Sequence, residues 1–202
     1  MACSNLPIIK PKVLAVEGDD DKYFFDKFIN LLRIFDVQTL VMRGRFPLSN
    51  KVKSVTKISG WNNVVSFGLV IDADADYPSA LMSVQHALIA ARLAVPSAAL
   101  LPAGRRRRVT FFILPGLTMR GAIEDLCLSS VRSHPVMACV DAYFHCLQRI
   151  NINCPKISKA KVHVFLASKR EPDKKLGQAT QAGYWPLSSA VFDDVRQFLR
   201  LL

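Results

Sequence analysis

The stretch Val64-Val65-Ser66-Phe67-Gly68-Leu69-Val70-Ile71-Asp72-Ala73-Asp74-Ala75-Asp76 decides the fold. Its first eight residues are mostly apolar, which is typical of a buried strand, and three aspartates follow at the strand's C-terminal end. The same arrangement occurs earlier, where residues 13–16 (Val-Leu-Ala-Val) run into Glu17-Gly18. In sheets of parallel strands, ligands bind beyond the carboxyl ends of the strands, so both acidic segments fall where a site is expected.

Further strands and helices alternate along the chain. Residues 37–42 and 109–114 are two more β-like runs, and residues 95–108 are predicted to form a loop. Helices are expected after Asp20 or Asp21, over residues 51–58 and from Pro78 onward. This order predicts an α/β fold with a mainly parallel four-stranded sheet that is flanked by helices on both faces.

The remaining chain has a helical pattern. Helices are expected over residues 121–128, 135–150, 157–168 and 191–202. In the third of these, we expect the inward side chains to be Ile157, Ala160, Val164, Phe165 and Ser168. We therefore divide the chain into an α/β core, residues 8–130, and a helical C-terminal extension, residues 131–202, packed on the core.

Composition excludes several classes of protein. The chain has 202 residues, of which 50% are hydrophobic, and this excludes a disordered polypeptide. No apolar run approaches the length that a membrane helix needs, and no signal peptide is visible. Five scattered cysteines without a C-x-x-C pair argue against a disulfide framework and a zinc knuckle. We expect a cytoplasmic protein that does not enter a membrane.

The charge is unevenly distributed. The formal net charge is +11, and residues 101–202 carry 16 basic against 7 acidic side chains. Nine of the 16 acidic residues lie in three short clusters, within residues 17–21, 72–76 and 124–125. A basic body with concentrated carboxylates suits a polyanion held near bound cations, while a merely basic protein without such a ligand explains the charge equally well.

The acidic clusters predict a metal site. In an Asp-x-Asp at a strand end both carboxylates lie on the same side of the chain, although a turn after Asp74 would redirect Asp76. Converging carboxylates repel one another unless a cation is present, and Mg²⁺ or Mn²⁺ is the natural choice for such oxygen ligands. The alternative is that these residues are solvated turn residues and helix caps.

These residues resemble a known family. Val-Glu-Gly-Asp-Asp-Asp-Lys (residues 16–22) and Val-Ile-Asp-Ala-Asp-Ala-Asp (residues 70–76) resemble the two signature motifs of the Toprim domain. Gly-Ala-Ile-Glu-Asp-Leu (residues 121–126) resembles a third acidic element of the nuclease-type variant found in OLD-type nucleases. The fuller pattern, with Leu-Gly-Gln-Ala-Thr-Gln-Ala-Gly-Tyr-Trp-Pro (residues 176–186), is similar to small stand-alone Toprim-like proteins of unassigned function.

The resemblance implies roles for individual residues. Glu17 would be a metal ligand or a general base, and in OLD-type nucleases a downstream lysine assists the metal, for which Lys161 is a candidate. The implied ligands of Mg²⁺ or Mn²⁺ are Glu17, Asp21, Asp72, Asp74, Asp76 and Glu124. Two metal ions about 4 Å apart would stabilise both ends of a phosphoryl transfer.

Basic residues supply candidate contacts to nucleic acid. The run Arg105, Arg106, Arg107 and Arg108 precedes a strand and would clamp phosphates, or else it is an exposed run without a specific role. Lysines at 159, 161, 169, 174 and 175 form a second basic region, in which solvated side chains are the simpler interpretation for most members. We expect Lys159 and Lys169 to point outward.

The sequence therefore leads to one main hypothesis and two alternatives. The main hypothesis is metal-dependent phosphodiester chemistry, in which a Toprim-type hydrolase nicks or cleaves nucleic acid. DNA rather than RNA is the expected substrate, and a separate ATPase is the expected partner. One alternative is a non-catalytic nucleic-acid- or nucleotide-binding module. The other is phosphotransfer on a small phosphorylated molecule. Whether the chain is an enzyme at all stays open at this point, because fold analogy does not establish activity.

Overall fold

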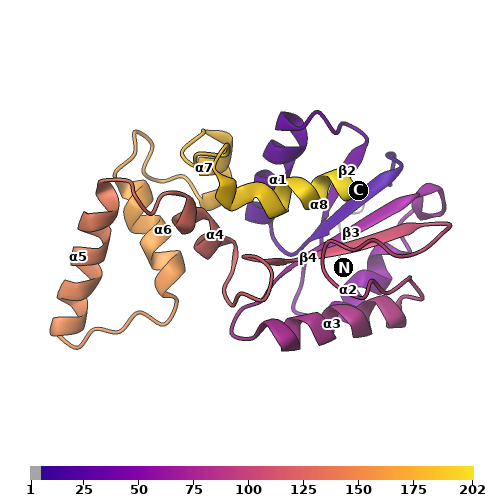
Figure 1. Ribbon diagram of the computed structural model, residues 1–202, viewed down its shortest axis with the longest axis horizontal. Coiled ribbons are helices and arrows are strands. Elements are labelled where there is room, and N and C mark those ends of the chain that lie inside the picture. The colour runs from indigo at the N-terminus through magenta and orange to yellow at the C-terminus, as the bar shows by residue number, and fades with distance from the viewer. Residues whose placement is uncertain (1–5) are drawn as a thin grey trace.

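Four parallel strands form the centre of the protein. The computed structural model describes residues 6–202, so Cys3 lies outside it. The strands are β1 (Lys12–Val16), β2 (Val37–Val41), β3 (Ser66–Asp72) and β4 (Arg108–Leu114), in the order β2-β1-β3-β4 (Figure 1). Every neighbouring pair is parallel. The predicted four-stranded parallel sheet is confirmed.

Helices connect the strands and continue after the last one. The connecting helices begin close to the expected positions, and Asp76 is the residue that caps the helix containing Pro78. One helix, α7, was not expected, and the last helix is preceded by a short 3₁₀ turn, Ala190–Phe192. The helices are α1 (Asp19–Leu31), α2 (Leu48–Val55), α3 (Tyr77–Ala90), α4 (Ile123–Ser130), α5 (Val136–Arg149), α6 (Ile157–Ala167), α7 (Leu176–Gln181) and α8 (Asp193–Leu201).

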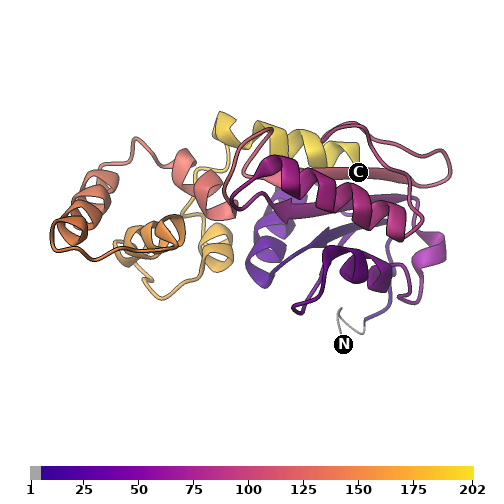
Figure 2. The ribbon, with the colours of Figure 1, turned by 90° about the horizontal axis from the view of Figure 1, so that it is seen from below.

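Alternation along the strands builds two hydrophobic cores, one on each face of the sheet. In β1, Leu14 and Val16 pack with residues of α1, α8 and α4–α7, whereas Val13 and Ala15 pack with residues of α2 and α3. Successive strand side chains point to opposite faces, so an apolar strand without polar alternation needs helices on both sides. Figure 2 shows α3 and α8 on different sides of the sheet.

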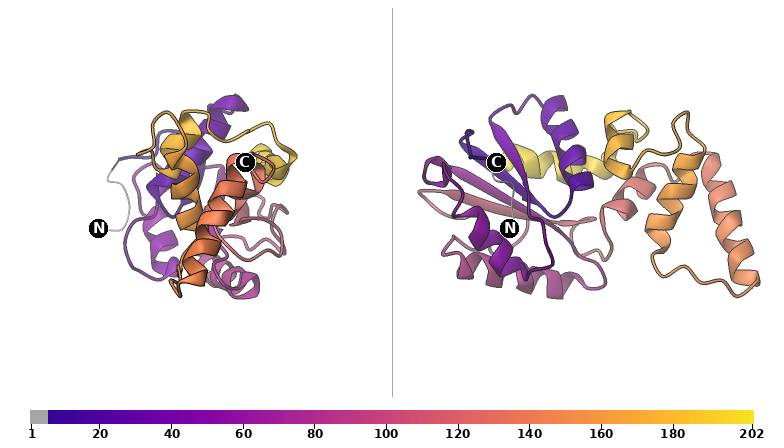
Figure 3. Two further views of the ribbon diagram at one scale, coloured as in Figure 1. Left: turned by 90° about the vertical axis from the view of Figure 1, so that its left-hand side faces the viewer. Right: turned by 180° about the vertical axis from the view of Figure 1, so that it is seen from behind.

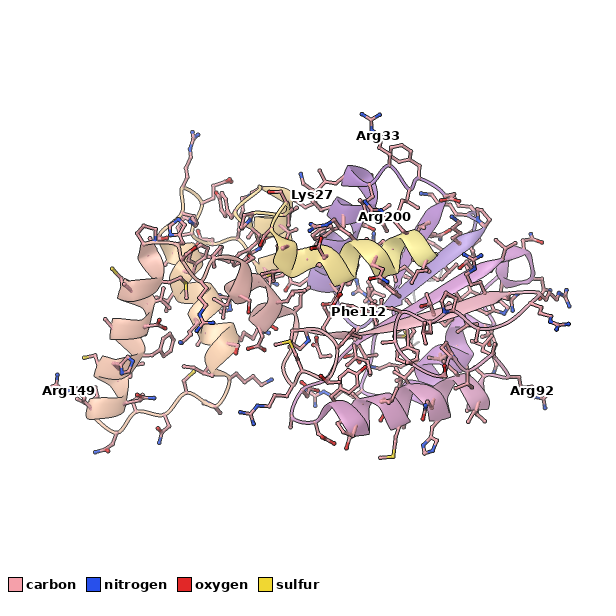
Figure 4. The ribbon with its side chains drawn as sticks, in the orientation of Figure 1. Lys27, Arg33, Arg92, Phe112, Arg149 and Arg200 are labelled. Atoms are coloured by element: carbon pink, nitrogen blue, oxygen red, sulfur yellow. The ribbon has the colours of Figure 1, made fainter. Side chains whose placement is uncertain are left out.

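The C-terminal helix α8 returns to the sheet. Phe198 stacks on Phe112 of β4 with ring centroids 5.7 Å apart, and Figure 4 labels Phe112 beneath this helix. Gly68 of β3 allows the close approach, because an added Cβ would lie 2.6 Å from the Leu202 side chain. Although it ends the chain, α8 is thus part of the cover of the α/β core.

Helices α5 and α6 project beyond α4, from the end of the sheet at which the strands finish (Figures 1 and 3). The buried stripe of α6 contains Val162, Phe165 and Leu166, and Phe165 stacks on Trp185 at 5.3 Å. Ile157 and Ser168, which were expected to face inward, are exposed. Ala160, Val164 and Phe165 do pack on the core as expected, but the buried stripe is centred on residues 162–166, because α6 packs against both α4 and α5.

Two sequence expectations concern the environment of the chain. None of the helices in residues 6–202 is long and apolar enough to cross a membrane. Cys127, Cys139, Cys146 and Cys154 are free thiols, of which Cys127 is buried.

Candidate functional site

Glu17 and Asp72 occupy the carboxyl ends of two adjacent strands. Asp72 is the last residue of β3 and Glu17 follows β1 directly. Both line a hollow of about 680 Å³, here called the carboxylate pocket, and both also line an adjoining hollow of about 440 Å³, the aspartate pocket. The carboxylate pocket is further lined by the acidic residues Asp19, Asp20, Asp21 and Glu124 and by Tyr23, Arg43, Lys159, Lys175 and Gln178.

Two helices begin at the carboxylate pocket, and their first backbone N–H groups orient two of the carboxylates. Before α1, the Gly18 N–H donates to Asp21 Oδ2 at 2.8 Å. At the start of α4, the Ile123 N–H donates to Asp72 Oδ1 at 3.1 Å. Charge-assisted bonds at helix N-termini stabilise carboxylates there. Each of the two carboxylates keeps one oxygen that these bonds do not use.

Burial and like charge disfavour ionisation of two of these groups. Burial, together with the neighbouring acids Asp21, Glu17, Glu124 and Asp74, raises the pKa of Asp72 to about 8. Burial also raises the pKa of Asp21 to about 7, against the lowering effect of the Gly18 N–H and together with Glu17 and Glu124. The acids from β1, α1, β3 and α4 thus form one electrostatically coupled group.

Other acidic residues of the same clusters are engaged elsewhere. Asp19 pairs with Arg43 at 2.6 Å, and Asp20 Oδ1 accepts a hydrogen bond from the Gly177 N–H of α7 at 2.9 Å. Asp125 accepts bonds from the Ala122 N–H and the Ser158 hydroxyl, so it joins the start of α4 to α6. These three aspartates stabilise the walls around the coupled acids.

The aspartate row of β3 turns sharply after its first member. Asp74 has a left-handed backbone with φ of 51°, and it exchanges two backbone hydrogen bonds, 2.8 and 2.7 Å long, with Gly121. Its side chain lines the aspartate pocket together with Glu17 and Asp72. Asp76 lines this pocket too, but its Oδ2 caps α3 by accepting bonds from the N–H and the hydroxyl of Ser79. The helix-cap interpretation thus holds for one oxygen of Asp76.

Three lysines approach these acids. Lys51 of α2 places its ammonium 3.6 Å from Glu17 Oε1, and only 14% of its side chain is exposed. Lys159 of α6 and Lys175, which precedes α7, line the carboxylate pocket, and within residues 6–202 neither has a carboxylate within 4.0 Å. Lys161 does not line the pocket; its ammonium lies 2.6 Å from Asp141 on α5.

The arginine run lies at the opposite end of the sheet. Arg108 begins β4, and a seven-residue strand spans about 20 Å, so the run is far from Asp72. The Arg107 guanidinium donates to the carbonyls of Val64 (2.8 Å) and Trp61 (2.9 Å) and lies 4.3 Å from the Trp61 ring centroid. Arg108 donates to the Leu201 carbonyl at 3.4 Å. Arg107 and Arg108 therefore form hydrogen bonds to distant parts of the chain. Arg105 and Arg106 are exposed.

The carboxylate pocket fits a divalent cation by the chemistry of its donors. Glu17, Asp21, Asp72 and Glu124 supply the hard oxygen ligands that Mg²⁺ and Mn²⁺ prefer. Their coupled charges would be relieved by such an ion. As the side chains stand, no three His, Cys, Asp or Glu residues in the described part of the chain are arranged to hold a metal ion together. Binding would therefore require changes of side-chain rotamer.

Comparison with known proteins identifies the family. A family model described as "Protein of unknown function (DUF3226)" matches residues 11–202. The chain belongs to this family. The match begins at β1 and ends after α8, so the sheet, the α5–α6 projection and the returning α8 belong to one family unit. Neither a curated protein nor a solved structure matches the chain.

Sequence reasoning located the acids of the site but missed most of its basic side. The sequence predicts Lys51 only as part of a short helix and Lys159 only as a solvated residue. The signal for Lys51 was available, since it begins the predicted helix that follows the second strand. Lys159 could not be placed because the phase of α6 depends on its two packing partners. Gln178 belongs to α7, the one helix that was not expected.

Proposed function

We propose that this chain is a Toprim-type, Mg²⁺- or Mn²⁺-dependent nuclease that nicks or cleaves nucleic acid, DNA in the first place, in the cytoplasm. One observation carries the proposal. Glu17, Asp21, Asp72 and Glu124, which come from three separate segments, line a single pocket together with two lysines that have no carboxylate within 4.0 Å in residues 6–202. Carboxylates beside free cations suit a phosphodiester that binds partly through a metal.

The side chains can be given roles in this chemistry. A divalent ion held by Glu17, Asp21, Asp72 and Glu124 would activate water and polarise the phosphodiester. The Ile123 N–H keeps Asp72 in place, and Lys51 keeps a positive charge beside Glu17. The nearby ammonium of Lys51 offsets part of the negative charge at Glu17, whose carboxylate would serve as a ligand or as a proton acceptor.

In this proposal, lysines at the edge of the carboxylate pocket, here called its rim, bind the parts of the substrate on either side of the reacting phosphate. Lys159 and Lys175 lie on the α6 and α7 side of the carboxylate pocket and are free to contact phosphate oxygens. Among residues 6–202, no basic residue lines the aspartate pocket, which shares Glu17 and Asp72 with the carboxylate pocket. A polyanion therefore enters the site from the lysine side. A separate ATPase partner, implied by the OLD-type resemblance, is part of the same proposal.

The test is a nicking assay on supercoiled plasmid DNA with Mg²⁺ or Mn²⁺. We expect conversion to open-circular or linear DNA by the wild type and none by the Asp72→Ala plus Asp74→Ala variant. Asp36→Ala is the matched control, because Asp36 forms an exposed ion pair with Lys12 at the start of β1, away from the pocket. Intact supercoiled DNA with the wild type in every metal contradicts the proposal.

A second function is favoured by one observation. Because no three ligand side chains are arranged around a common ion in residues 6–202, a non-catalytic nucleic-acid-binding module also accounts for the site. In that case the raised pKa values of Asp21 and Asp72 mean that the pocket is partly neutral without metal. Retained DNA binding by the wild type, with intact plasmid in all metals, would support the module.

A further inference from the structure

The exposed side chain of Tyr23 lies at the edge of the carboxylate pocket and has no role in the proposed cleavage reaction. Tyr23 lies on α1, one turn after Asp19, and 46% of its surface is exposed. It lines the carboxylate pocket and also two adjoining hollows of about 940 and 700 Å³. The ring therefore stands at a junction of three hollows, with open space on more than one side.

The position of Tyr23 is held by the chain around it. Gly177 of α7 packs so closely that an added Cβ would lie 2.8 Å from the Tyr23 Cβ, and the Gln181 side-chain amide donates to the Tyr23 carbonyl. The same glycine binds Asp20 through its N–H, which fixes α7 on the first turns of α1. Helix α7 thus supports the backbone of Tyr23 while its ring stays exposed.

Lys159 and Lys175, which have no carboxylate within 4.0 Å in the described part of the chain, complete the rim. Lys159 and Lys175 line the carboxylate pocket with Tyr23, and they come from α6 and from the start of α7. An aromatic ring beside two free cations matches the parts of a nucleotide, because bases stack on aromatic side chains and phosphates pair with ammonium groups.

We infer that the carboxylate pocket takes an unpaired nucleotide of a single strand, with its base stacked on Tyr23 and the flanking phosphates on Lys159 and Lys175. This inference rests on the proposed function for the identity of the polyanion. A base inside a duplex is already stacked on both of its faces, so it can reach the Tyr23 ring only after leaving the helix. Single strands are therefore preferred over duplexes.

Binding of a fluorescent DNA 20-mer in EDTA tests the inference without any cleavage. The full-length protein is titrated against the single strand and against the duplex of the same sequence. We expect the single strand to bind at least about tenfold more tightly. Tyr23→Leu keeps the packing on Gly177 but removes the ring, and it should weaken single-strand binding about 5- to 100-fold. Tyr23→Phe should keep wild-type affinity, and Tyr143→Leu, at an exposed tyrosine on α5, is the matched control.

The lysines have a separate readout in the salt dependence of the same binding. Loss of two phosphate contacts to a single strand lowers the slope of log affinity against log salt by about 1.4. We expect this for Lys159→Ala plus Lys175→Ala and no change for Lys53→Ala plus Lys57→Ala, two exposed lysines outside the pocket. Equal affinity of the wild type for single strand and duplex, or unchanged binding by Tyr23→Leu, overturns the inference.

The two proposals can fail separately. Single-strand preference that depends on Tyr23, in a protein that leaves plasmid intact with every metal, supports this inference and contradicts the nuclease. Metal-dependent nicking by a protein whose Tyr23→Leu variant binds single strands like the wild type overturns the inference and leaves the nuclease standing.

Discussion

The two ends of the sheet carry the densest charge clusters of the chain, and their charges are engaged in opposite ways. At the amino end, Arg107 donates to two carbonyls and lies over Trp61, and Arg108 binds the end of α8. At the carboxyl end, the acids repel one another, and the ion pair between Lys51 and Glu17 offsets only part of their charge. These acids are Glu17, Asp21, Asp72 and Glu124. A charged cluster indicates a ligand site where like charges gather in one pocket, but not where each charge already has a partner within the protein.

The largest expected difference between the two ends is in activity. Asp72→Asn removes a charged ligand but preserves its shape, and we expect at least about a 100-fold loss of metal-dependent cleavage, since even outer-shell changes cost 10- to 100-fold. Arg105→Ala plus Arg106→Ala at the other end should change cleavage less than about twofold. Initial nicking rates at saturating metal measure both. A larger loss in the arginine variant would mean that substrate binds at the amino end.

The second difference is in stability at the amino end. Arg107→Ala removes two hydrogen bonds and a cation–π contact and leaves the Val64 and Trp61 carbonyls without this donor. We expect a loss of about 2 kcal/mol in the free energy of unfolding. Arg105→Ala, at an exposed residue, is the control and should lose less than about 0.5 kcal/mol. Chemical denaturation measures both, and equal stabilities would contradict a structural role for Arg107.

These contrasts show what could be predicted from the sequence. Order of strands and helices, the parallel sheet and the position of Glu17 and Asp72 follow from apolar runs and from the acids at their ends. The role of Arg107 could not be predicted, because its partners lie more than 40 residues away in the chain. The sequence offers Lys161 rather than Lys159 as the candidate for a different reason, because the phase of α6 depends on its packing against α4 and α5.

The third contrast is the pH dependence of stability at the carboxyl end. Because the pKa values of Asp72 and Asp21 are raised to about 8 and 7, the folded protein binds more protons than the unfolded chain above about pH 4. The stabilisation from protonation is complete below pH 4 and is lost as the pH rises through 7 and 8. Without metal, we expect the free energy of unfolding to fall by several kcal/mol between pH 5 and 8.5, most of it before the pH reaches 8.

The control for this titration is Asp72→Asn, which stays neutral at every pH. Its stability should fall clearly less over the same range, and Arg107→Lys at the other end should keep the wild-type slope. A wild-type protein whose stability rises between pH 5 and 8.5 would contradict the burial and mutual repulsion of these acids.

The smallest expected effect is on stability, and it separates Asp76 as the cap of α3 from Asp72 as a metal ligand. Asp76→Ala removes the cap of α3 and should lower stability by about 1 kcal/mol, while Asp76→Asn should keep most of it. Neither variant should approach the loss of cleavage expected for Asp72→Asn. Thermal unfolding and the nicking assay measure the two properties. A loss of cleavage in Asp76→Asn equal to that in Asp72→Asn would make Asp76 a ligand rather than only a cap.

The central claim is that the acids at the carboxyl end share a divalent cation, and thermal unfolding at pH 8 with and without millimolar Mg²⁺ or Mn²⁺ tests it most directly. A cation at a hundredfold excess over its Kd adds about 2.7 kcal/mol, which raises the Tm of a chain of this size by about 5 to 10 °C. We predict this rise for the wild type and for Arg105→Ala, and its loss in Asp72→Asn and Asp74→Asn, whose metal-free forms should be slightly more stable than the wild type because a repelling charge is gone. Identical melting curves for the wild type and Asp72→Asn, with and without each metal, would contradict the claim.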